Sequence, residues 1–367
     1  MSRWAWAEVS ATAIEHNVRT IAAAVAPAQV WAVVKANGYG HGAVLAARAA
    51  QAGGASGLCV ALVQEGVELR AAGVDGPILV LSEQPPEMVA LAVEHDLALT
   101  IYSEAQIAEL SALGAVGHPV HLKVDTGMRR VGAATHDAVA LADAIAASRA
   151  VALDGVFTHL AVADEPENPF TEQQLDRFDE VLAALAAAGH QPPHVHAANS
   201  AGALAHPRAR YGMVRAGIAI YGISPGAGVD GYCTALHPAL SLHARVGHVK
   251  RVQAGERISY GLRHTFERDA TVATLPLGYA DGVPRRLHAA GGSVLIGGHH
   301  RPIVGVVTMD QLMVDCGDDH VQVGDDAVLL GHQGAQAISP AEWATALDTI
   351  AYEIVCGISA RVERRAV

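Results

Sequence analysis

Eight short runs of apolar or β-branched residues alternate with Ala- and Leu-rich amphipathic segments from residue 30 to about residue 225. In chain order the runs are VWAVVK, GLCVALV, PILVLS, LALTIYS, VHLKVD, LDGVFTH, HVHAAN and MVRAGIAIYG. Strands that alternate with helices in this way form a parallel sheet, and eight such units predict a (β/α)8 TIM barrel. We expect one more helix, from about Ala11 to Ala26, to cover the bottom of the barrel.

The alternation of strand and helix stops near residue 235. The segments ALSLHARVGHVKRV, ERISYG, DATVATLPLGY, GSVLIGGHHRPIVGVV and MDQLMVDC then follow one another with turns and without long helical spacers, which is typical of an all-β domain. A Gly- and Pro-rich stretch, ISPGAGVDGY, precedes them and marks the boundary. We predict a barrel domain over residues 1–232 and a C-terminal all-β domain over residues 233–367.

The charge of the chain argues against nucleic acid and anionic membrane surfaces as partners. The formal net charge is -12, and a net-acidic surface is repelled by phosphate groups. Hydrophobic residues make up 51% of the 367 positions, which is ample for a folded core. A globular protein with a small-molecule substrate is the expectation.

No segment has the composition of a signal peptide or a membrane span. Glu8 and Glu15 interrupt the N-terminal stretch where a signal peptide needs an unbroken apolar run. The least charged long stretch, residues 216–233, contains an aspartate and is broken by Gly and Pro. We therefore expect a cytoplasmic protein that does not enter a membrane.

The cysteines and histidines do not predict a metal site. The four cysteines are scattered without C-x-x-C spacing, which also argues against a disulfide scaffold. The pairs His299-His300 and His194-x-His196 have no cysteine or carboxylate cluster at ligand spacing, so strand or loop histidines are the better interpretation.

Polar residues stand where the predicted strands end, which is where barrels of this type place reactive groups. Lys35 ends the first strand and is followed by ANGYGHG, a flexible loop that contains Tyr39 and His41. A lysine at the end of a strand is by itself most often a solvated charge. The residues around Lys35 decide between a solvated charge and a chemical role.

The segment AVVKANGYGHG resembles the cofactor-lysine motif of bacterial alanine racemases. LKVDTGMRRVG, FTHLAVADE, HAANSAGAL, MVRAGIAIYG, RISYG, LPLGYADG and VTMDQLMVD follow in that family's order, and the opening WAEVSATAIEHNVR resembles its first helix. The resemblance covers nearly the whole chain. It implies an isomerase of fold type III that uses pyridoxal 5'-phosphate to interconvert L-alanine and D-alanine for the bacterial cell wall.

The resemblance also implies a pair of catalytic residues in a homodimer. Lys35 binds the cofactor covalently and handles the α-proton on the face of the D-enantiomer, a role that suits its amine. Tyr260, in RISYG, is the acid and base on the opposite face. It is expected to come from the β domain of the partner subunit, so that each active site is shared between two chains.

Further cofactor contacts follow from the same motifs. Arg215 is expected to face the pyridine nitrogen; because arginine can only donate, that nitrogen stays unprotonated and the carbanionic intermediate is short-lived. His159 is expected to support Arg215 through a hydrogen bond. Asn199 and Ser200 also suit a simple helix cap, which is compatible with phosphate binding. The positions that match the family's phosphate contacts are Tyr39, Ser200, Gly217 and Ile218.

The substrate contacts implied by the resemblance come from both domains. Arg130 is expected to meet the substrate carboxylate, and Met309 of the second subunit offers its backbone N–H. Lys123 matches a lysine that is carbamylated in many members, which turns a cation that would repel Arg130 into an anion that positions it. Tyr279 and Asp310 are expected to narrow the entrance.

Two positions depart from the family pattern: Ala360 stands where many members have a phosphate-contacting tyrosine, and Arg129 replaces a small or amide residue. A related racemase with serine or broad specificity stays an alternative, because a methylene or hydroxyl changes binding by only about 1–3 kcal/mol. Arg215 argues against a barrel decarboxylase, which needs a protonated pyridine. The β domain argues against a cofactor carrier that consists of the barrel alone.

Overall fold

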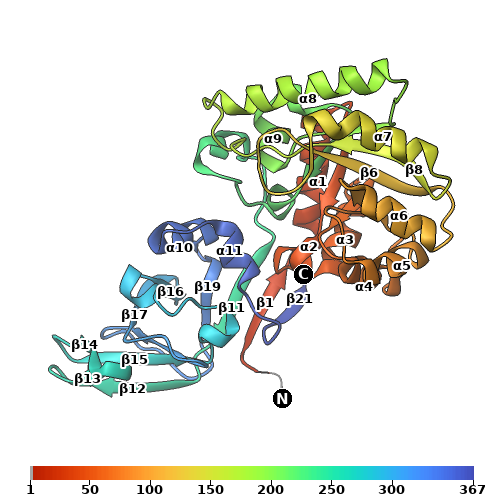
Figure 1. Cartoon of the computed structure of the whole chain (residues 1–367). Helices are drawn as coiled ribbons and strands as arrows, with labels where there is room; N and C mark the ends of the chain where they lie inside the picture. Colours follow the sequence, from red (N-terminus) through yellow and green to blue (C-terminus); the bar gives the residue numbers. More distant parts are fainter. Residues whose placement is uncertain (1–2) are drawn as a thin grey trace. The chain divides into compact units, whose positions relative to one another are not determined.

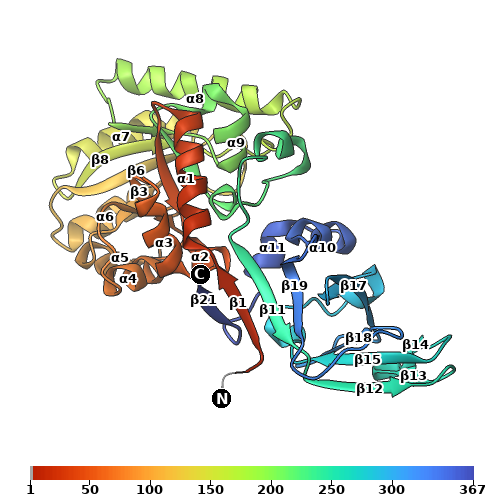
Figure 2. The same ribbon diagram turned by 180° about the vertical axis from the view of Figure 1, so that it is seen from behind.

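The computed structural model describes residues 3–367 (Figure 1, and from behind in Figure 2). They form two compact units. The barrel unit consists of Thr12–Gly38 and Gly42–His237, and the β unit consists of the described residues through Ala11, Tyr39–His41 and Pro238–Val367. No helix in this described part of the chain is long and apolar enough to cross a membrane.

The boundary between the units differs from the one expected at residue 232. It falls between His237 and Pro238, and the start of the chain belongs to the β unit instead of the barrel. The reason is strand pairing: β1 (Ala5–Val9) lies between β11 (Leu240–Arg245) and β21 (Glu363–Ala366), antiparallel to the first and parallel to the second.

The predicted (β/α)8 barrel is confirmed, with one strand at each of the eight runs. The parallel strands are β2 (Gln29–Val33), β3 (Gly57–Val60), β4 (Ile78–Val80), β5 (Ala98–Ile101), β6 (His118–Asp125), β8 (Val151–Phe157), β9 (His194–His196) and β10 (Met213–Ala216). They pair in the order β10-β2-β3-β4-β5-β6-β8-β9, and the short β7 (Ala133–Ala134) adds to β6. Backbone hydrogen bonds from Gly212 to Val195 and from Arg215 to Ala198 bridge β9 and β10.

Helices surround these strands (Figure 1). The helices are α2 (Lys35–Tyr39), α3 (Ala43–Ala52), α4 (Val63–Ala71), α5 (Pro86–Glu94), α6 (Glu104–Ala112), α7 (Ala138–Ala147), α8 (Phe170–Ala187) and α9 (Ser200–Ala205), with a 3-10 turn η3 (Ile218–Tyr221) after β10. Each longer helix buries one face, as α8 does with Leu175, Phe178, Val181 and Leu185 at helical spacing. The apolar periodicity of the sequence thus sets which face meets the strands.

Helix α1 (Ala11–Val25) does not cover the bottom of the barrel, so that expectation was wrong. It lies beside α3 and the segment that follows β10: Arg19 donates to Ala52 O at 3.2 Å, and Asn17 donates to Ile220 O at 3.0 Å. The chain leaves the barrel after η3 without a long helix. The apolar face of α1 fills that place in the outer ring, because there it is covered by neighbouring elements.

The expected separate β domain is confirmed. Its strands are β1, β11, β12 (His248–Val252), β13 (Arg257–Ile258), β14 (His264–Thr265), β15 (Ala270–Leu275), β16 (Ser293–Ile296), β17 (His299–Val304), β18 (Leu312–Asp315), β19 (Asp326–Gln333), β20 (Gln336–Ile338) and β21. One sheet runs in the order β12-β15-β18-β17-β16-β19-β11-β1-β21, and β13 and β14 form a separate ribbon. Two short helices, α10 (Pro340–Leu347) and α11 (Ala351–Cys356), complete the unit.

Asn17 gives a test of the position of α1. Its buried amide donates to Ile220 O and His237 O and accepts from His237 N at 2.7 Å. Asn17→Ala leaves these backbone groups without partners, so we expect it to lower the free energy of unfolding by about 1–3 kcal/mol. Urea denaturation measures this loss. Asn168→Ala, in a surface loop, is the control, and equal losses in the two variants would contradict the packing described for α1.

Candidate active site

Five basic side chains gather at the carboxyl ends of the barrel strands. They are Lys35 after β2, Lys123 in β6, Arg130 in the loop after β6, His159 after β8 and Arg215 in β10. Burial, followed by the charges of the neighbouring cations, lowers the pKa values of Lys123 and His159. Because Lys35, Arg130 and Arg215 act on both groups, the structure brings these predicted site residues together.

Lys35 begins a tight left-handed turn. Ala36 and Asn37 both have φ of 53°, which is costly for residues that carry a Cβ atom. Side chains hold the turn: Glu65 Oε1 accepts from Ala36 N at 2.7 Å, and Asn37 Oδ1 accepts from Ala43 N at 2.9 Å. The lysine therefore leaves the end of β2 in a fixed direction.

Arg215 is a buried cation with a nearly complete set of partners. Its Nη1 donates to His196 Nδ1 at 2.5 Å, and its Nη2 donates to Thr158 O at 2.9 Å and Ala197 O at 3.0 Å. His159 Nδ1, its expected partner, lies 3.3 Å from Nη2. Burial lowers the pKa of Arg215 to about 10, so it stays charged at neutral pH. Among residues 3–367, the Nε–H and the second N–H of Nη1 have no acceptor and are left to donate to a further group.

The groups around Arg215 are pushed toward their neutral forms. Burial, and then the charge of Arg215, holds the pKa of His159 well below its usual value. The same two causes come first for Lys123, whose pKa falls to about 7. Lys123 Nζ donates to Leu81 O at 3.1 Å and lies 5.2 Å from the centre of the Phe157 ring. A lysine of this kind is partly an uncharged amine near neutral pH.

Ser200 joins the ends of β9 and β10. Its Oγ is buried and accepts from Gly217 N at 2.8 Å and from Ala219 N at 3.4 Å. Asn199 caps α9 by accepting from Gly202 N at 2.9 Å, as the cap interpretation expected. The first turns of α9 and η3 thus meet at one hydroxyl, and unpaired N–H groups of first turns are suited to an anion.

Tyr39, another expected phosphate contact, belongs to the β unit. Its ring centre lies 6.0 Å from that of Tyr352, and the adjacent Gly40 O accepts from Arg364 Nε at 2.9 Å. Ala360, where the family pattern has a tyrosine, is exposed in the turn before β21.

Tyr260 follows β13 and presents its side chain at the surface of the β unit, 72% exposed. The preceding Ser259 has φ of 66° and is held by a hydrogen bond from its Oγ to Val306 O at 2.8 Å. Tyr260 lines an open pocket of about 720 Å³ together with Lys250 and Thr308. A strained but anchored residue thus sets the direction of this tyrosine.

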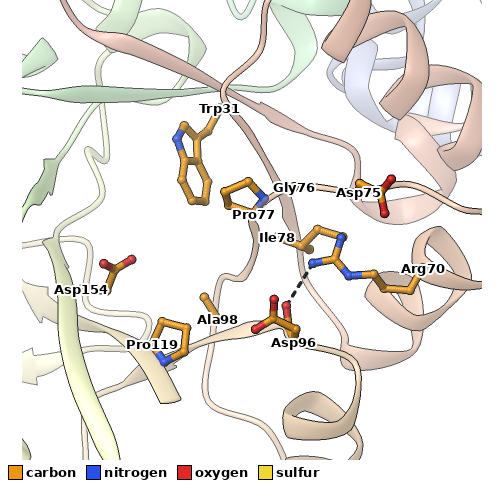
Figure 3. A pocket seen from close by; sticks show the side chains of 10 residues that line it. All are labelled: Trp31, Arg70, Asp75, Gly76, Pro77, Ile78, Asp96, Ala98, Pro119 and Asp154. Atoms are coloured by element: carbon orange, nitrogen blue, oxygen red, sulfur yellow. Dashed lines mark hydrogen bonds between the residues drawn. The ribbon is translucent and has the colours of Figure 1, made fainter. Parts of the chain in front are cut away.

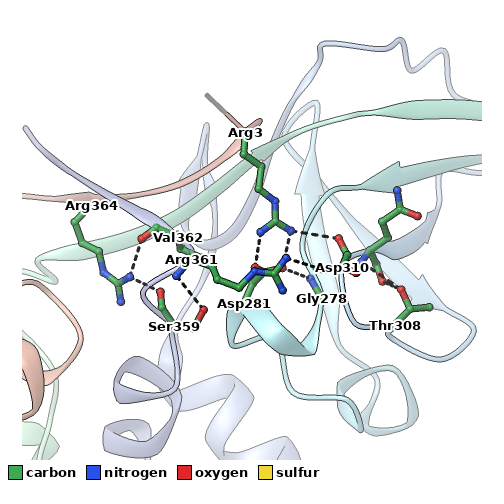
Figure 4. A network of polar contacts seen from close by, with 10 residues as sticks. Arg3, Gly278, Asp281, Thr308, Asp310, Ser359, Arg361, Val362 and Arg364 are labelled. Carbon is green, nitrogen blue, oxygen red and sulfur yellow. Dashed lines mark hydrogen bonds and ion pairs between the residues drawn. The ribbon is translucent and has the colours of Figure 1, made fainter. Parts of the chain in front are cut away.

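A buried carboxylate organises the residues expected at the entrance (Figure 4). Asp281 is fully buried and accepts from both Nη atoms of Arg3, at 2.5 and 2.7 Å, and from Gly278 N at 2.9 Å. Arg361 lies 3.5 Å from Asp281 and donates to the carboxylate of Asp310 at 2.6 Å. Two arginines therefore share one buried aspartate, and one of them also binds Asp310.

Backbone hydrogen bonds join the turn of Tyr279 to the turn of Met309. Tyr279 N donates to Thr308 O at 2.9 Å, and Ala280 N donates to Met309 O at 3.1 Å. A Cβ atom at Gly278 would lie 2.3 Å from Met309 O, so only glycine permits this approach. The structure thus brings Tyr279, Met309 and Asp310 together.

Sequence reasoning missed the residues that hold others in place. His196 was interpreted as an ordinary strand histidine, although the H-x-H spacing puts His194 and His196 on one face of a strand. Arg3, Asp281 and Arg361 were not considered, because they lie far apart in the sequence and meet only when β1 and β21 pair.

Comparison with known proteins decides the family. The model for the alanine racemase N-terminal domain matches residues 9–225, and that for the C-terminal domain matches residues 239–366. The chain belongs to the alanine racemase family. An alanine racemase of Symbiobacterium thermophilum is 49% identical over 98% of this chain and 96% of its own length.

Solved structures agree with this membership. The alanine racemase of Bacillus anthracis with bound L-Ala-P superposes with a TM-score of 0.95 at 39% identity, covering 100% of this chain and 96% of that one. A histidine racemase from Leuconostoc mesenteroides superposes with a TM-score of 0.92 at 29% identity, covering 100% and 98%. As a member of the alanine racemase family, the chain is an isomerase that acts on an amino acid.

Asp281→Asn tests the entrance network. The substitution keeps the shape of the side chain but leaves Arg3 and Arg361 without their shared buried charge, so we expect a loss of about 3–5 kcal/mol in unfolding free energy. Asp326→Asn, which affects the exposed ion pair with Arg245, is the control and should cost about 0–1 kcal/mol. Guanidinium denaturation compares them. Similar small losses would show that Asp281 does not hold the turns.

Proposed function

We propose that this chain interconverts L-alanine and D-alanine with pyridoxal 5'-phosphate bound to Lys35. The observation that carries the proposal is the buried, charged Arg215 at the carboxyl ends of the strands, whose Nη atoms each donate to protein groups and whose Nε–H has no acceptor among the described residues. When bound, the cofactor supplies an electron sink for removal of the substrate α-proton.

The residues present fit that cofactor. Arg215 offers a donor to a ring nitrogen that can accept, and Ser200 with the first turns of α9 and η3 offers polar partners to a phosphate. Lys35 acts electrostatically on Lys123, His159 and the buried Cys59, so its amine lies among these groups. Tyr39, Gly217 and Ile218 are proposed as the other phosphate contacts.

The chemistry of Arg215 favours racemisation over other reactions of the same cofactor. An arginine that stays charged can only donate, so Arg215 would hold the ring nitrogen of a bound cofactor unprotonated and make that ring a weaker electron sink. A weaker sink would favour return of the α-proton over other reactions of the same cofactor. Lys35 takes or returns the proton on one face, and the partner's Tyr260 does so on the other.

Substrate binding is proposed to use both chains of a homodimer. Arg130 meets the substrate carboxylate, and Met309 of the partner subunit adds its backbone N–H. Tyr279 and Asp310 of the partner subunit narrow the entrance, held in place by the network around Asp281. Location in the cytoplasm and supply of D-alanine for the cell wall stay predictions.

Alanine is preferred over serine and larger amino acids in this proposal, because the resemblance runs through the entrance motifs. The histidine racemase superposes as a whole, so the fold alone does not choose the substrate. Comparison of kcat/KM for alanine, serine and histidine with the purified protein decides between these candidates.

Mixing two inactive variants tests the function and the shared site together. Lys35→Ala should lose racemisation and, after dialysis, the visible absorption of bound cofactor. Tyr260→Phe should keep the cofactor but lose most activity. After subunit exchange, half of the dimers are mixed and each has one intact site, so about a quarter of wild-type activity per chain should return. Exchange verified by native mass spectrometry without recovered activity would contradict the shared site.

Lys123 is proposed to form a carbamate. Its neutral amine attacks carbon dioxide, a C–N bond forms, and one proton is released to solvent. Because its pKa is about 7, the neutral form dominates at pH 8 and the carbamate should form there and disappear below pH 6. Carbon-13 NMR of protein in labelled bicarbonate measures it. The carbamate signal should be present in the unaltered protein and in Lys250→Met, which replaces an exposed lysine, and absent from Lys123→Met. A signal in all three proteins would refute the assignment to Lys123.

A further inference from the structure

Two hydrogen bonds and one longer polar contact lead from Arg215 to a carboxylate at the opposite end of the barrel strands. Arg215 Nη1 lies 2.5 Å from His196 Nδ1, and His196 Nε2 lies 2.9 Å from His121 Nδ1. His121 Nε2 lies 3.4 Å from Asp154 Oδ2. Both imidazoles are fully buried.

Asp154 lines a pocket at the N-terminal ends of the strands, where Figure 3 shows it with Trp31 and Pro119. This is the face away from Lys35, because Trp31 lies near the start of β2 and Lys35 follows its end. The chain of side chains thus runs along the inside of the barrel.

The local backbone directs Asp154 toward His121. Val120 of β6 pairs with Leu153, whereas His121 pairs with Gly155, so Asp154 is the extra residue of a β-bulge. A Cβ atom at Gly155 would lie 2.3 Å from His121 Nδ1, so the imidazole occupies the space that a side chain there would need. The bulge at Asp154 and the missing side chain at Gly155 therefore leave the space that the His121 ring occupies.

The direction of each hydrogen bond follows from the donor at the start. Arginine only donates, so His196 Nδ1 must accept and its proton sits on Nε2. His196 Nε2–H then donates to His121 Nδ1, which places the proton of His121 on Nε2, facing Asp154. Both rings are neutral in this arrangement, and all three contacts point from the cation to the carboxylate.

The charges at the two ends support this direction. Burial lowers the pKa values of both imidazoles, and the contact with His121 lowers the pKa of Asp154. His194 also borders the chain, with its Nε2 4.0 Å from Asp154 Oδ2 and its ring stacked on His121. Among residues 3–367, no carboxylate forms an ion pair with Arg215, so Asp154 reaches it only through the two rings.

We infer that His196, His121 and Asp154 are positioning residues that fix the orientation of the Arg215 guanidinium. They hold Nη1 in place, and this sets the direction in which the Nε–H points. The inference rests on the proposed function, because the group that Nε meets is the ring nitrogen of the cofactor. The three residues act through Arg215 and do not contact the substrate.

Nitrogen-15 NMR of histidine-labelled holoenzyme reads the proton positions directly, with His196→Gln and His121→Gln to assign the signals. We expect both rings neutral with the proton on Nε2. A proton on Nδ1 of His196, or a doubly protonated ring, would overturn the chain of hydrogen bonds. This readout does not depend on racemisation, so it stays valid if the proposed function fails.

Asp154→Ala tests the end of the chain. Without Asp154 the Nε2–H of His121 loses the carboxylate that it faces, while the proton position set by Arg215 and His196 stays. The His121 ring is then held at one end only, so kcat for alanine should fall about tenfold while KM changes less than twofold, as expected for a residue that orients another. Asp143→Ala, which removes the surface partner of His190, is the matched control and should change neither. Asp154→Asn keeps a neutral acceptor, so its kcat should lie between those of Asp154→Ala and the unaltered protein. It provides the test if Asp154→Ala does not fold. An unchanged kcat in both Asp154 variants, with an unchanged nitrogen-15 shift of His121 Nε2, would refute the inference.

Discussion

The structure of the barrel site depends on the burial of a permanent cation. Arg215 lies inside the barrel, where an unpaired charge is costly. Carbonyl oxygens of Thr158 and Ala197 and the nitrogen of His196 compensate the guanidinium. Burial and the charge of Arg215 together lower the pKa values of the neighbouring groups. His196 and His159 are therefore neutral, and Lys123 is partly neutral.

The β unit also contains a buried charge, but a negative one. Asp281 is a fully buried charge there, and Arg3 and Arg361 reach it from the segments just before β1 and β21, which pair with each other. Because Arg361 also holds Asp310, the ion pairs fix turns that carry exposed side chains. Each unit thus contains a buried charge that is compensated by several partners.

The regular parts of the fold could be predicted from the sequence, and the irregular parts could not. Apolar runs of strand length identified all eight barrel strands, because each strand is buried on both faces. The amphipathic pattern of α1 gave a helix but not its neighbours, since any apolar surface satisfies such a face. Motif resemblance named Lys35, Arg215 and Tyr260, but the role of Asp154 depends on a bulge that shifts register by one residue, and strand periodicity does not reveal a bulge.

The buried cation belongs to the barrel unit, and the turns of Tyr279 and Met309 belong to the β unit. The groups that surround Arg215 are buried and mutually dependent, and a change in one of them alters the charge state of the others. The side chains of Tyr279 and Met309 are exposed, and their turns are held by backbone hydrogen bonds, by the Thr308 hydroxyl and by the ion pairs of Asp281 and Asp310. The contacts that hold these turns thus share no residue with the partners of Arg215, so a substitution in the turns leaves the partners of the buried cation in place.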